Sequence, residues 1–448
     1  MSLAGNQDHH NPGSVASSLK LSEDSTISDW TESKAAADSA DDDNSHKCSN
    51  VRSIINIVLT AIGLGVITLP TVMATCGWIG GILVLFVAAA LSDYMVCNLY
   101  KAVTNHPKGD PINTYEELGR VCFGRAGQII TALIVHVTMT GVCATLLLLL
   151  GENTQKLAPE LSVTVWCVIW AAICLPLSWL RSLKEISYVA MVGLIGVIAL
   201  FIIIAAKGIE NGITTDEEIQ YDLFNGDALT WAVSFGNAIL SYQMASATPT
   251  LIREMITPSA FPRSASAGLL IVFIIYVGVG ACGYYGYGRN LIDVPIMNSI
   301  APSGQALDAW GYVAVIAMLL LAFPHYLVIL MPIAASLEYA VNIDVDSTAK
   351  RDLIKRIVAR TFLVAITLVI AIVVPSVDKL INLMGVFTMI AMAGVLPALF
   401  YTRIRVFNEG SLKAVWKAHR LEMCLLCALT LLCLLVMGAG GYQSIVDF

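Results

Sequence analysis

Long apolar runs follow one another through most of this 448-residue chain. Between residues 53 and 440 there are eleven of them, each about as long as a helix needs to cross the ~30 Å hydrocarbon core of a bilayer. Charged residues make up only 13% of the chain, whereas soluble domains carry about 25%. A soluble enzyme is therefore excluded, and the sequence predicts an all-α integral membrane protein.

The predicted transmembrane helices can be oriented from their flanking charges, because Lys and Arg favour cytosolic loops. With a cytosolic N-terminus, all but four of the 26 basic residues lie on the cytosolic side. The C-terminus then lies on the opposite face. The eleven predicted spans are 53–75, 77–100, 128–150, 162–180, 186–206, 229–252, 264–286, 308–334, 357–374, 379–400 and 421–440.

Residues 1–49 differ from everything that follows. They carry nine acidic residues against three lysines and contain no apolar run, so we expect a disordered acidic cytosolic tail. The rest, residues 50–448, is expected to form one transmembrane domain. The chain has no basic surface for nucleic acid and no H-E-x-x-H or Gly-x-Ser-x-Gly sequence. We therefore expect no nucleic-acid partner, metal or cofactor, and no enzymatic activity.

The first span is predicted to break near its middle. Gly63 and Gly65 lie there, and Pro70 follows; glycines let a chain leave helical geometry and approach a ligand closely. Unwinding would free N–H groups of one half-helix and C=O groups of the other, which suit the carboxylate and ammonium of an amino acid. Close packing of small residues against a neighbouring helix is the alternative interpretation.

The sixth span, 229–252, carries a polar cluster at bilayer depth. Ser241, Tyr242 and Gln243 precede Pro249, and such a cluster should face a cavity or another helix. Two broken helices five spans apart are typical of a 5+5 inverted-repeat transporter with a site at the midplane. The repeats would cover about 53–206 and 229–400, and span 421–440 would be an extra eleventh helix.

Several motifs occur in order along these spans. The first span contains Asn56, Gly63, Gly65 and Pro70. After it come the segments TYEELGRVCFGRAG, LGEN and LPLSWLRSLKEISYVAMVGLIG. The sixth span contains FGNAILSYQMASATPTLIREMITPSAF, and the later spans contain GYYGYG and LMGVFTMIAMAGVLP. Together they resemble the amino acid/auxin permease family, a branch of the amino acid–polyamine–organocation superfold. The resemblance covers about residues 51–405.

This resemblance implies a secondary active amino acid transporter that works by alternating access, coupled to protons or to sodium. Many members carry Phe-Glu-Gly-His where this chain has Tyr242-Gln243-Met244-Ala245, so a neutral Gln243 is not the coupling residue. The resemblance implies that the substrate backbone is held at the break in the first span by Ala61, Gly63, Leu64 and Gly65. The residues that face it from the sixth span are Ser241, Tyr242 and Gln243. The residues that help to shape the pocket are Thr60, Ile62 and Phe235.

The coupling ion is expected to be a proton. Sodium-coupled relatives place an Asn where this chain has Leu59, and span 308–334 contains no Ser or Thr to ligate sodium. The candidates for proton coupling are the ionisable residues within spans: His325, Asp93 and His136. His325 is preferred because it titrates near neutrality and its span packs against the broken helices in this superfold. A structural role for His325, and pairing of Asp93 with Lys101, are the alternatives.

The expected partners are an amino acid as the small-molecule substrate, a proton (sodium is less expected) and the lipid bilayer. An amino-acid-sensing receptor on the same fold and a sodium-coupled transporter remain the alternative functions. The protein is expected to be multi-pass, with a cytosolic N-terminus, in the plasma membrane or in a vacuolar, lysosomal or vesicular membrane.

Overall fold

The computed structural model describes residues 49–446, except 108, 110–111, 180–182, 217, 293, 341–349 and 375, and it leaves out the side chains of 64, 183–191 and 339–340. Nearly all of the predicted tail, residues 1–49, lies outside the described residues. Across the described residues the elements are helices and no strand occurs. Eight of these helices are long and apolar enough to cross a membrane. The predicted all-α membrane class is confirmed, and the count of eleven spans stays a prediction.

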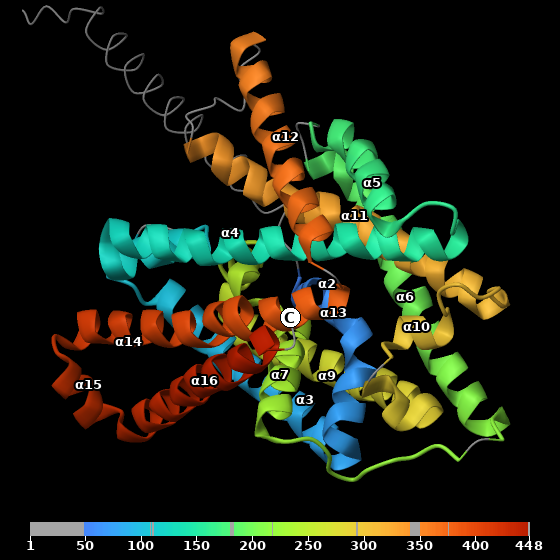
Figure 1. Cartoon of the computed structure of the whole chain (residues 1–448). Coiled ribbons are helices and arrows are strands. Elements are labelled where there is room, and N and C mark those ends of the chain that lie inside the picture. The colour runs from blue at the N-terminus through green and yellow to red at the C-terminus, as the bar shows by residue number, and fades with distance from the viewer. Residues whose placement is uncertain are drawn as a thin grey trace, which may run out of the picture.

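Figure 1 shows the helices in chain order. Their bounds are α2 (Asn50–Ala61), η1 (Leu64–Thr68), α3 (Leu69–Thr104), α4 (Tyr115–Leu157), α5 (Val163–Ser178), α6 (Leu183–Thr214), α7 (Ala228–Ser241), η2 (Ala245–Ala247), α8 (Thr248–Arg253), η3 (Pro258–Ala260), α9 (Phe261–Tyr287), η4 (Gly288–Ile292), α10 (Ile296–Ile300), α11 (Ala309–Ala340), α12 (Lys350–Val373), α13 (Val377–Leu383), the π-helical η5 (Met384–Met389) and η6 (Ala391–Val395), α14 (Leu396–Glu409), α15 (Leu412–Ala418) and α16 (Arg420–Val446).

The first predicted span is interrupted where its glycines indicated. Helix α2 ends at Ala61, and residues 62–63, here called the first break, have extended backbone geometry. The chain resumes as the short 3₁₀ helix η1 and then as α3. Helix α3 itself turns sharply at Gly77, whose φ of 81° lies in the left-handed region. A Cβ there would also lie 2.8 Å from the backbone of Leu223, so the turn requires glycine.

The sixth predicted span is interrupted as well. Helix α7 starts at the N-cap Asp227, whose carboxylate accepts from the Thr230 amide, and ends at Ser241. Residues 242–244, here called the second break, are not helical. The short η2 and α8 follow, with Pro249 in the first turn of α8, where its missing N–H costs no intrahelical bond.

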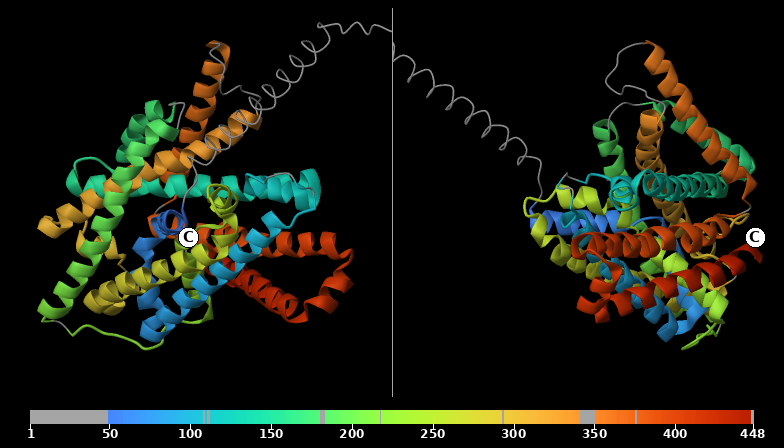
Figure 2. Two further views of the ribbon diagram at one scale, coloured as in Figure 1. Left: turned by 180° about the vertical axis from the view of Figure 1, so that it is seen from behind. Right: turned by 90° about the vertical axis from the view of Figure 1, so that its left-hand side faces the viewer.

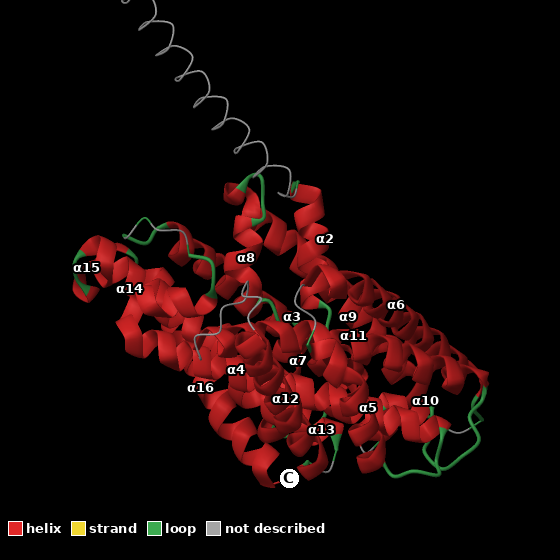
Figure 3. Ribbon diagram, turned by 90° about the horizontal axis from the view of Figure 1, so that it is seen from above, coloured by secondary structure: helices red, strands yellow, loops and turns green. Residues whose placement is uncertain are grey.

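The long helices pack around these two interrupted segments. Helix α3 contacts α7 and α9, α11 contacts α4 and α6, and α16 contacts α7. The hairpin of α14, α15 and α16 projects to one side, as Figures 1 and 2 show. Figure 3 places α2 and α8 at one end of the molecule and α10 and α13 at the other. We call the end that carries α2 the N-terminal face, and the end that carries α10 and α13 the far face.

Candidate functional site

The two breaks lie directly against each other. A Cβ built on Gly65, in η1, would stand 2.5 Å from the Cα of Ser241, the last residue of α7. Real Cβ atoms do not approach a backbone carbon so closely, so only glycine allows this contact. The structure thus brings the predicted residues Gly65 and Ser241 together, although 176 positions separate them in the sequence.

A tyrosine from a third helix joins the two breaks. The Tyr276 hydroxyl, on α9, lies 2.7 Å from the carbonyl oxygen of Ser241 and 3.1 Å from that of Ala61. Each carbonyl belongs to the last helical residue before a break, where an α-helix leaves its C=O groups without an intrahelical partner. The hydroxyl has one hydrogen, so the two carbonyls share it. Tyr276 is 0% exposed, and water does not compete for this bond.

Other polar groups near the breaks bond within their own segments. The Thr68 hydroxyl donates to the carbonyl of Gly65 at 2.7 Å, and the Ser241 hydroxyl donates to the carbonyl of Asn237 at 2.9 Å. The Val66 amide donates to the carbonyl of Gly63 at 3.4 Å. These bonds stabilise both interruptions, because a buried backbone group without a partner is costly at bilayer depth.

His325 faces the first break. A Cβ built on Gly63 would lie 3.8 Å from His325 Nε2, an ordinary van der Waals distance. His325 lies on α11 just after Pro324, and none of the hydrogen bonds or ion pairs in the described part of the chain involves it. Of the three predicted coupling residues, His325 is therefore the one placed beside the broken backbone.

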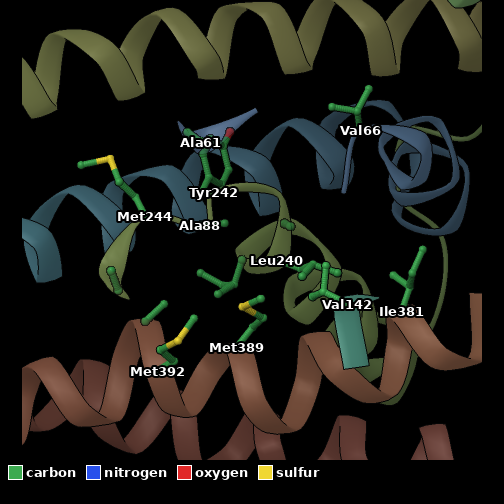
Figure 4. Close-up of a cluster of buried hydrophobic side chains, with 14 of the residues drawn as sticks. Ala61, Val66, Ala88, Val142, Leu240, Tyr242, Met244, Ile381, Met389 and Met392 are labelled. Carbon is green, nitrogen blue, oxygen red and sulfur yellow. The ribbon is translucent and has the colours of Figure 1, made fainter. Parts of the chain in front are cut away.

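Tyr242 is the first residue of the second break. Its side chain is 1% exposed and its ring centroid lies 5.1 Å from that of Tyr276. Its hydroxyl has no hydrogen-bond partner among the described residues. Ala61 and Tyr242 both belong to the buried cluster drawn in Figure 4. Two phenols thus line the junction of the breaks, one bonded to backbone and one unbonded.

The remaining predicted substrate residues occupy different surroundings. Thr60 is exposed, and its hydroxyl donates to the carbonyl of Asn56 at 2.7 Å. Gln243 is half-buried and points its amide toward the sulfur of Met139, 3.9 Å away. Phe235 lies six residues before Ser241, about 9 Å of helix rise, and lines an apolar groove between α3, α7 and α16. The backbone of Leu64 starts η1, while its side chain is not described; Ile62 is half-buried in the first break.

Asp93 and His136 lie outside this junction. The Asp93 carboxylate accepts from the Ser266 hydroxyl at 2.8 Å, between α3 and α9. The suggested pairing of Asp93 with Lys101 is wrong, because Lys101 forms its ion pair with Glu422 of α16 at 3.0 Å. His136 is half-buried on α4, and none of the bonds among the described residues involves it.

The tenth span supports the second broken helix. A Cβ on Gly385 would lie 2.9 Å from the backbone of Gly236, so α7 and η5 touch through two glycines. Beside this contact, the Asn237 amide donates to Asn382 at 2.7 Å. The span is π-helical over Met384–Met389 and Ala391–Val395, and such bulges are frequent at functional sites.

Sequence reasoning missed Tyr276 and the Asn237–Asn382 pair. The available signal was a phenol and an amide at membrane depth, because each has a polar group that needs a partner there. The sequence pattern does not identify the partners of these groups, because each partner belongs to a span that is distant in the sequence. Among the described residues, no group of three or more His, Cys, Asp or Glu side chains could hold a metal ion.

The family profile of transmembrane amino acid transporter proteins matches residues 46–445. The chain belongs to this family. The match spans the described helices apart from the last residue of α16, and it confirms the resemblance predicted from the motifs. The chain is therefore a multi-pass membrane protein of a transporter family, not an enzyme.

Curated relatives carry the same description. Amino acid transporter AVT1D of Arabidopsis thaliana is 27% identical over 373 residues, which cover 80% of this chain and 64% of that protein. AVT1E of the same plant is 24% identical, over 87% of this chain and 73% of its own length. Vacuolar amino acid transporter 3 of Saccharomyces cerevisiae is 22% identical, over 82% of this chain and 53% of its own. The chain thus spans about two thirds of AVT1D and about half of the yeast relative.

Solved structures share the fold. The inward-facing conformation of Mhp1 superposes with a TM-score of 0.56 at 14% identity, over 90% of this chain and 92% of that one. A sodium-coupled sialic acid symporter in a substrate-bound outward-open state has a TM-score of 0.51 at 12% identity, over 90% of both chains. At these identities the likeness concerns the fold alone, and it confirms the predicted inverted-repeat class with broken helices 1 and 6.

Proposed function

We propose that this chain is a proton-coupled secondary active transporter of an amino acid, which it carries by alternating access. The substrate would lie between the two breaks, in contact with residues 61–65 and 241–243. The observation that carries the proposal is the junction itself: two interrupted helices, five spans apart, meet at Gly65 and Ser241 and share the Tyr276 hydroxyl. Family membership supports an amino acid as the substrate.

The chemistry of the junction suits a zwitterion. The N-terminal end of η1 follows the first break and offers amide N–H groups to a carboxylate, because helix N-termini favour anions. The C-terminal ends of α2 and α7 offer carbonyls, which suit an ammonium group. In the occupied state the substrate ammonium would compete with Tyr276 for the carbonyls of Ala61 and Ser241. Tyr276 is then a positioning residue that holds both carbonyls in place.

Proton coupling rests on the position of His325. Its imidazole lies beside Gly63, so its charge would act on the backbone dipoles that hold the substrate. A histidine can take up and release a proton, and an ionisable side chain within a span is usually functional. The second candidate, sodium coupling, is favoured by one neighbour in fold, a sodium-coupled symporter. It is opposed by the residues: Leu59 and the lack of Ser and Thr in 308–334 leave few oxygen ligands.

The test uses the full chain in proteoliposomes and a panel of labelled amino acids. We expect counterflow of at least one amino acid at equal pH on both sides, and accumulation when a pH gradient is imposed. Replacing sodium with choline should leave both rates unchanged. A strict sodium requirement would contradict proton coupling while preserving the transporter assignment. Saturable binding without counterflow would instead favour the amino-acid-sensing receptor.

A further inference from the structure

A small polar cavity lies on the far face, beside η1 but outside the contact of Gly65 with Ser241. The end of α4 supplies Glu152, Asn153 and Lys156, the first turn of α13 supplies Asp378, and α10 closes the third side. Its volume of about 20 Å³ is enough for one water molecule. Three chain segments far apart in sequence therefore converge on a site that none of the described functions uses.

Asn153 indicates that the cavity can bind a polar ligand. Its side chain is 1% exposed, and its amide nitrogen donates to the carbonyl of Leu149 at 2.9 Å. Asn153 lines the cavity, and its amide oxygen has no hydrogen-bond partner among the described residues. A buried acceptor without a donor is costly. A guest that can donate a hydrogen bond would satisfy it.

The charges around the cavity do not balance. Lys156 directs its ammonium to the carbonyl of Met297 at 3.1 Å and the side-chain oxygen of Asn298 at 2.7 Å, both on α10. Among the ion pairs within 4.0 Å in the described part of the chain, none includes Glu152 or Asp378. Two carboxylates thus face one ammonium, which leaves one negative charge in excess.

The neighbouring elements do not cancel this excess. Helix α10 and η1 contain no titratable residue. Lys379, the next residue along α13, does not line the cavity. Helix α5, which packs against α4, contains no Lys, Arg or His that could supply a positive charge. One added proton would make the cluster neutral, whereas a partly buried excess charge is unfavourable at this depth.

The cavity shares part of its wall with η1, the helix that follows the first break. Ile67, in η1, forms part of its wall, and α10 contacts η1. Lys156 therefore holds α10 against α4 directly beside the segment that follows Gly65. A movement of η1 that opens the far face would change this wall and expose the two carboxylates to water.

We propose that Glu152 and Asp378, with Asn153 and Lys156, form the site at which the transporter takes up its proton from the far face. This inference rests on the proposed proton-coupled function and adds a loading site to it. A hydronium ion gives its proton to a carboxylate oxygen, an O–H bond forms, and a water molecule is released. The cluster is then neutral, and Lys156 keeps α10 packed against α4. The O–H of the carboxylic acid can donate a hydrogen bond to the amide oxygen of Asn153.

The experiment compares two transport measurements on the same proteoliposomes. Counterflow at equal pH reports substrate exchange, and accumulation under an imposed pH gradient reports proton coupling. The variants are Glu152→Gln and Asp378→Asn, each of which removes one carboxylate. The matched control is Glu160→Gln, an exposed acid in the loop after α4 on the same face. Proton entry is followed in parallel with a pH dye trapped in the vesicles.

We expect each cluster variant to lose at least about tenfold in gradient-driven accumulation, within the range of ordinary coupling energies, while counterflow stays within about threefold of wild type. Substrate-dependent proton entry should fall together with accumulation, and Glu160→Gln should behave as wild type. If one variant fails to insert, the other tests the same site from a different helix, and Glu152→Asp, which keeps the carboxylate, should restore accumulation.

Three results would overturn this inference. Cluster variants that accumulate substrate like wild type show that the carboxylates do not carry the proton. Equal losses of counterflow and accumulation in both variants assign the cluster a structural role. Accumulation by wild type that follows sodium rather than pH removes the proton altogether. A wild-type protein without counterflow of any amino acid would mean that the proposed function itself has failed.

Discussion

The hydroxyl of Tyr276 lies 2.7 Å from the carbonyl oxygen of Ser241, the last helical residue before the second break. The same hydroxyl lies 3.1 Å from the carbonyl of Ala61, the last helical residue before the first break. One side chain of α9 therefore couples the ends of both interrupted helices. Because the phenol is fully buried, the two breaks are held in a fixed relative position in this conformation.

Replacing Tyr276 with Phe removes the shared donor but keeps the ring. We expect the protein to insert, to lose about 1–3 kcal/mol of stability from the unsatisfied carbonyls, and to exchange substrate about tenfold more slowly. Thermal unfolding in detergent and counterflow in proteoliposomes measure the two effects. Tyr285→Phe, a partly exposed tyrosine on the same helix, is the control. Wild-type counterflow in Tyr276→Phe would show that the bridge is dispensable.

The two glycines of the first span should differ in their tolerance to alanine. At Gly65 an added Cβ would lie 2.5 Å from the Ser241 Cα, so Gly65→Ala should push the breaks apart and abolish transport. At Gly63 the added Cβ has ordinary contact with His325, so Gly63→Ala should retain activity within about threefold. Gly278→Ala, where the space is open, serves as the control. Counterflow that is equal in Gly65→Ala and Gly63→Ala would contradict the close contact.

His325 should couple the proton without holding the substrate. We expect His325→Gln to keep counterflow at equal pH and to lose at least about tenfold in accumulation driven by a pH gradient. The reason is that glutamine fills a similar space but cannot take up a proton. His136→Gln, a change on α4 away from the junction, should keep accumulation at the wild-type level. The opposite ranking of the two variants would move the coupling role from His325 to His136.

The loop that follows α6 should release from η4 and α3 in acid. Asp222 accepts hydrogen bonds from Arg289, and this contact lowers the pKa of the Asp222 carboxyl below its usual value of 3.8. A carboxyl whose pKa is lowered by folding stabilises the docked loop at higher pH and loses this effect as the pH falls through its folded pKa. Docking should therefore persist at pH 5 and weaken near pH 3.

Hydrogen exchange measures this loop docking. The amides of Trp78 and Ile79 donate to the carbonyls of Asp222 and Leu223, so they report whether the loop is in place. We expect protection at pH 5, faster exchange near pH 3 after correction for the intrinsic rate, and faster exchange at both pH values in Arg289→Gln. Exchange in wild type that does not depend on pH would rule out a contribution from the Asp222–Arg289 pair.

Local sequence rules predicted the breaks but not what joins them. The Gly63 and Gly65 pair and the polar residues 241–243 are exceptions within apolar runs, so they are visible in one sequence. Tyr276 stands in an apolar run of its own, and nothing nearby in the sequence indicates that it reaches two carbonyls 35 and 215 residues away. Long-range partners of this kind follow from helix packing, which periodicity does not encode.

The charged residues show the same division. The sequence identifies Asp93 as an ionisable residue within a span, but it suggests Lys101, eight residues away, as its ion-pair partner. The structure pairs Lys101 with Glu422 and Asp93 with Ser266 instead. Lys156 of α4 and Asp378 of α13 line the same cavity, although 222 positions separate them, so no local pattern could have predicted this.

The most direct test of the central claim is a structure of the full chain with the transported amino acid bound. We predict density for the substrate between residues 61–65 and 241–243, with the carboxylate against the start of η1 and the ammonium against the carbonyls of Ala61 and Ser241. Density for the amino acid at any other place, with the junction of Gly65 and Ser241 closed and empty, would contradict the account.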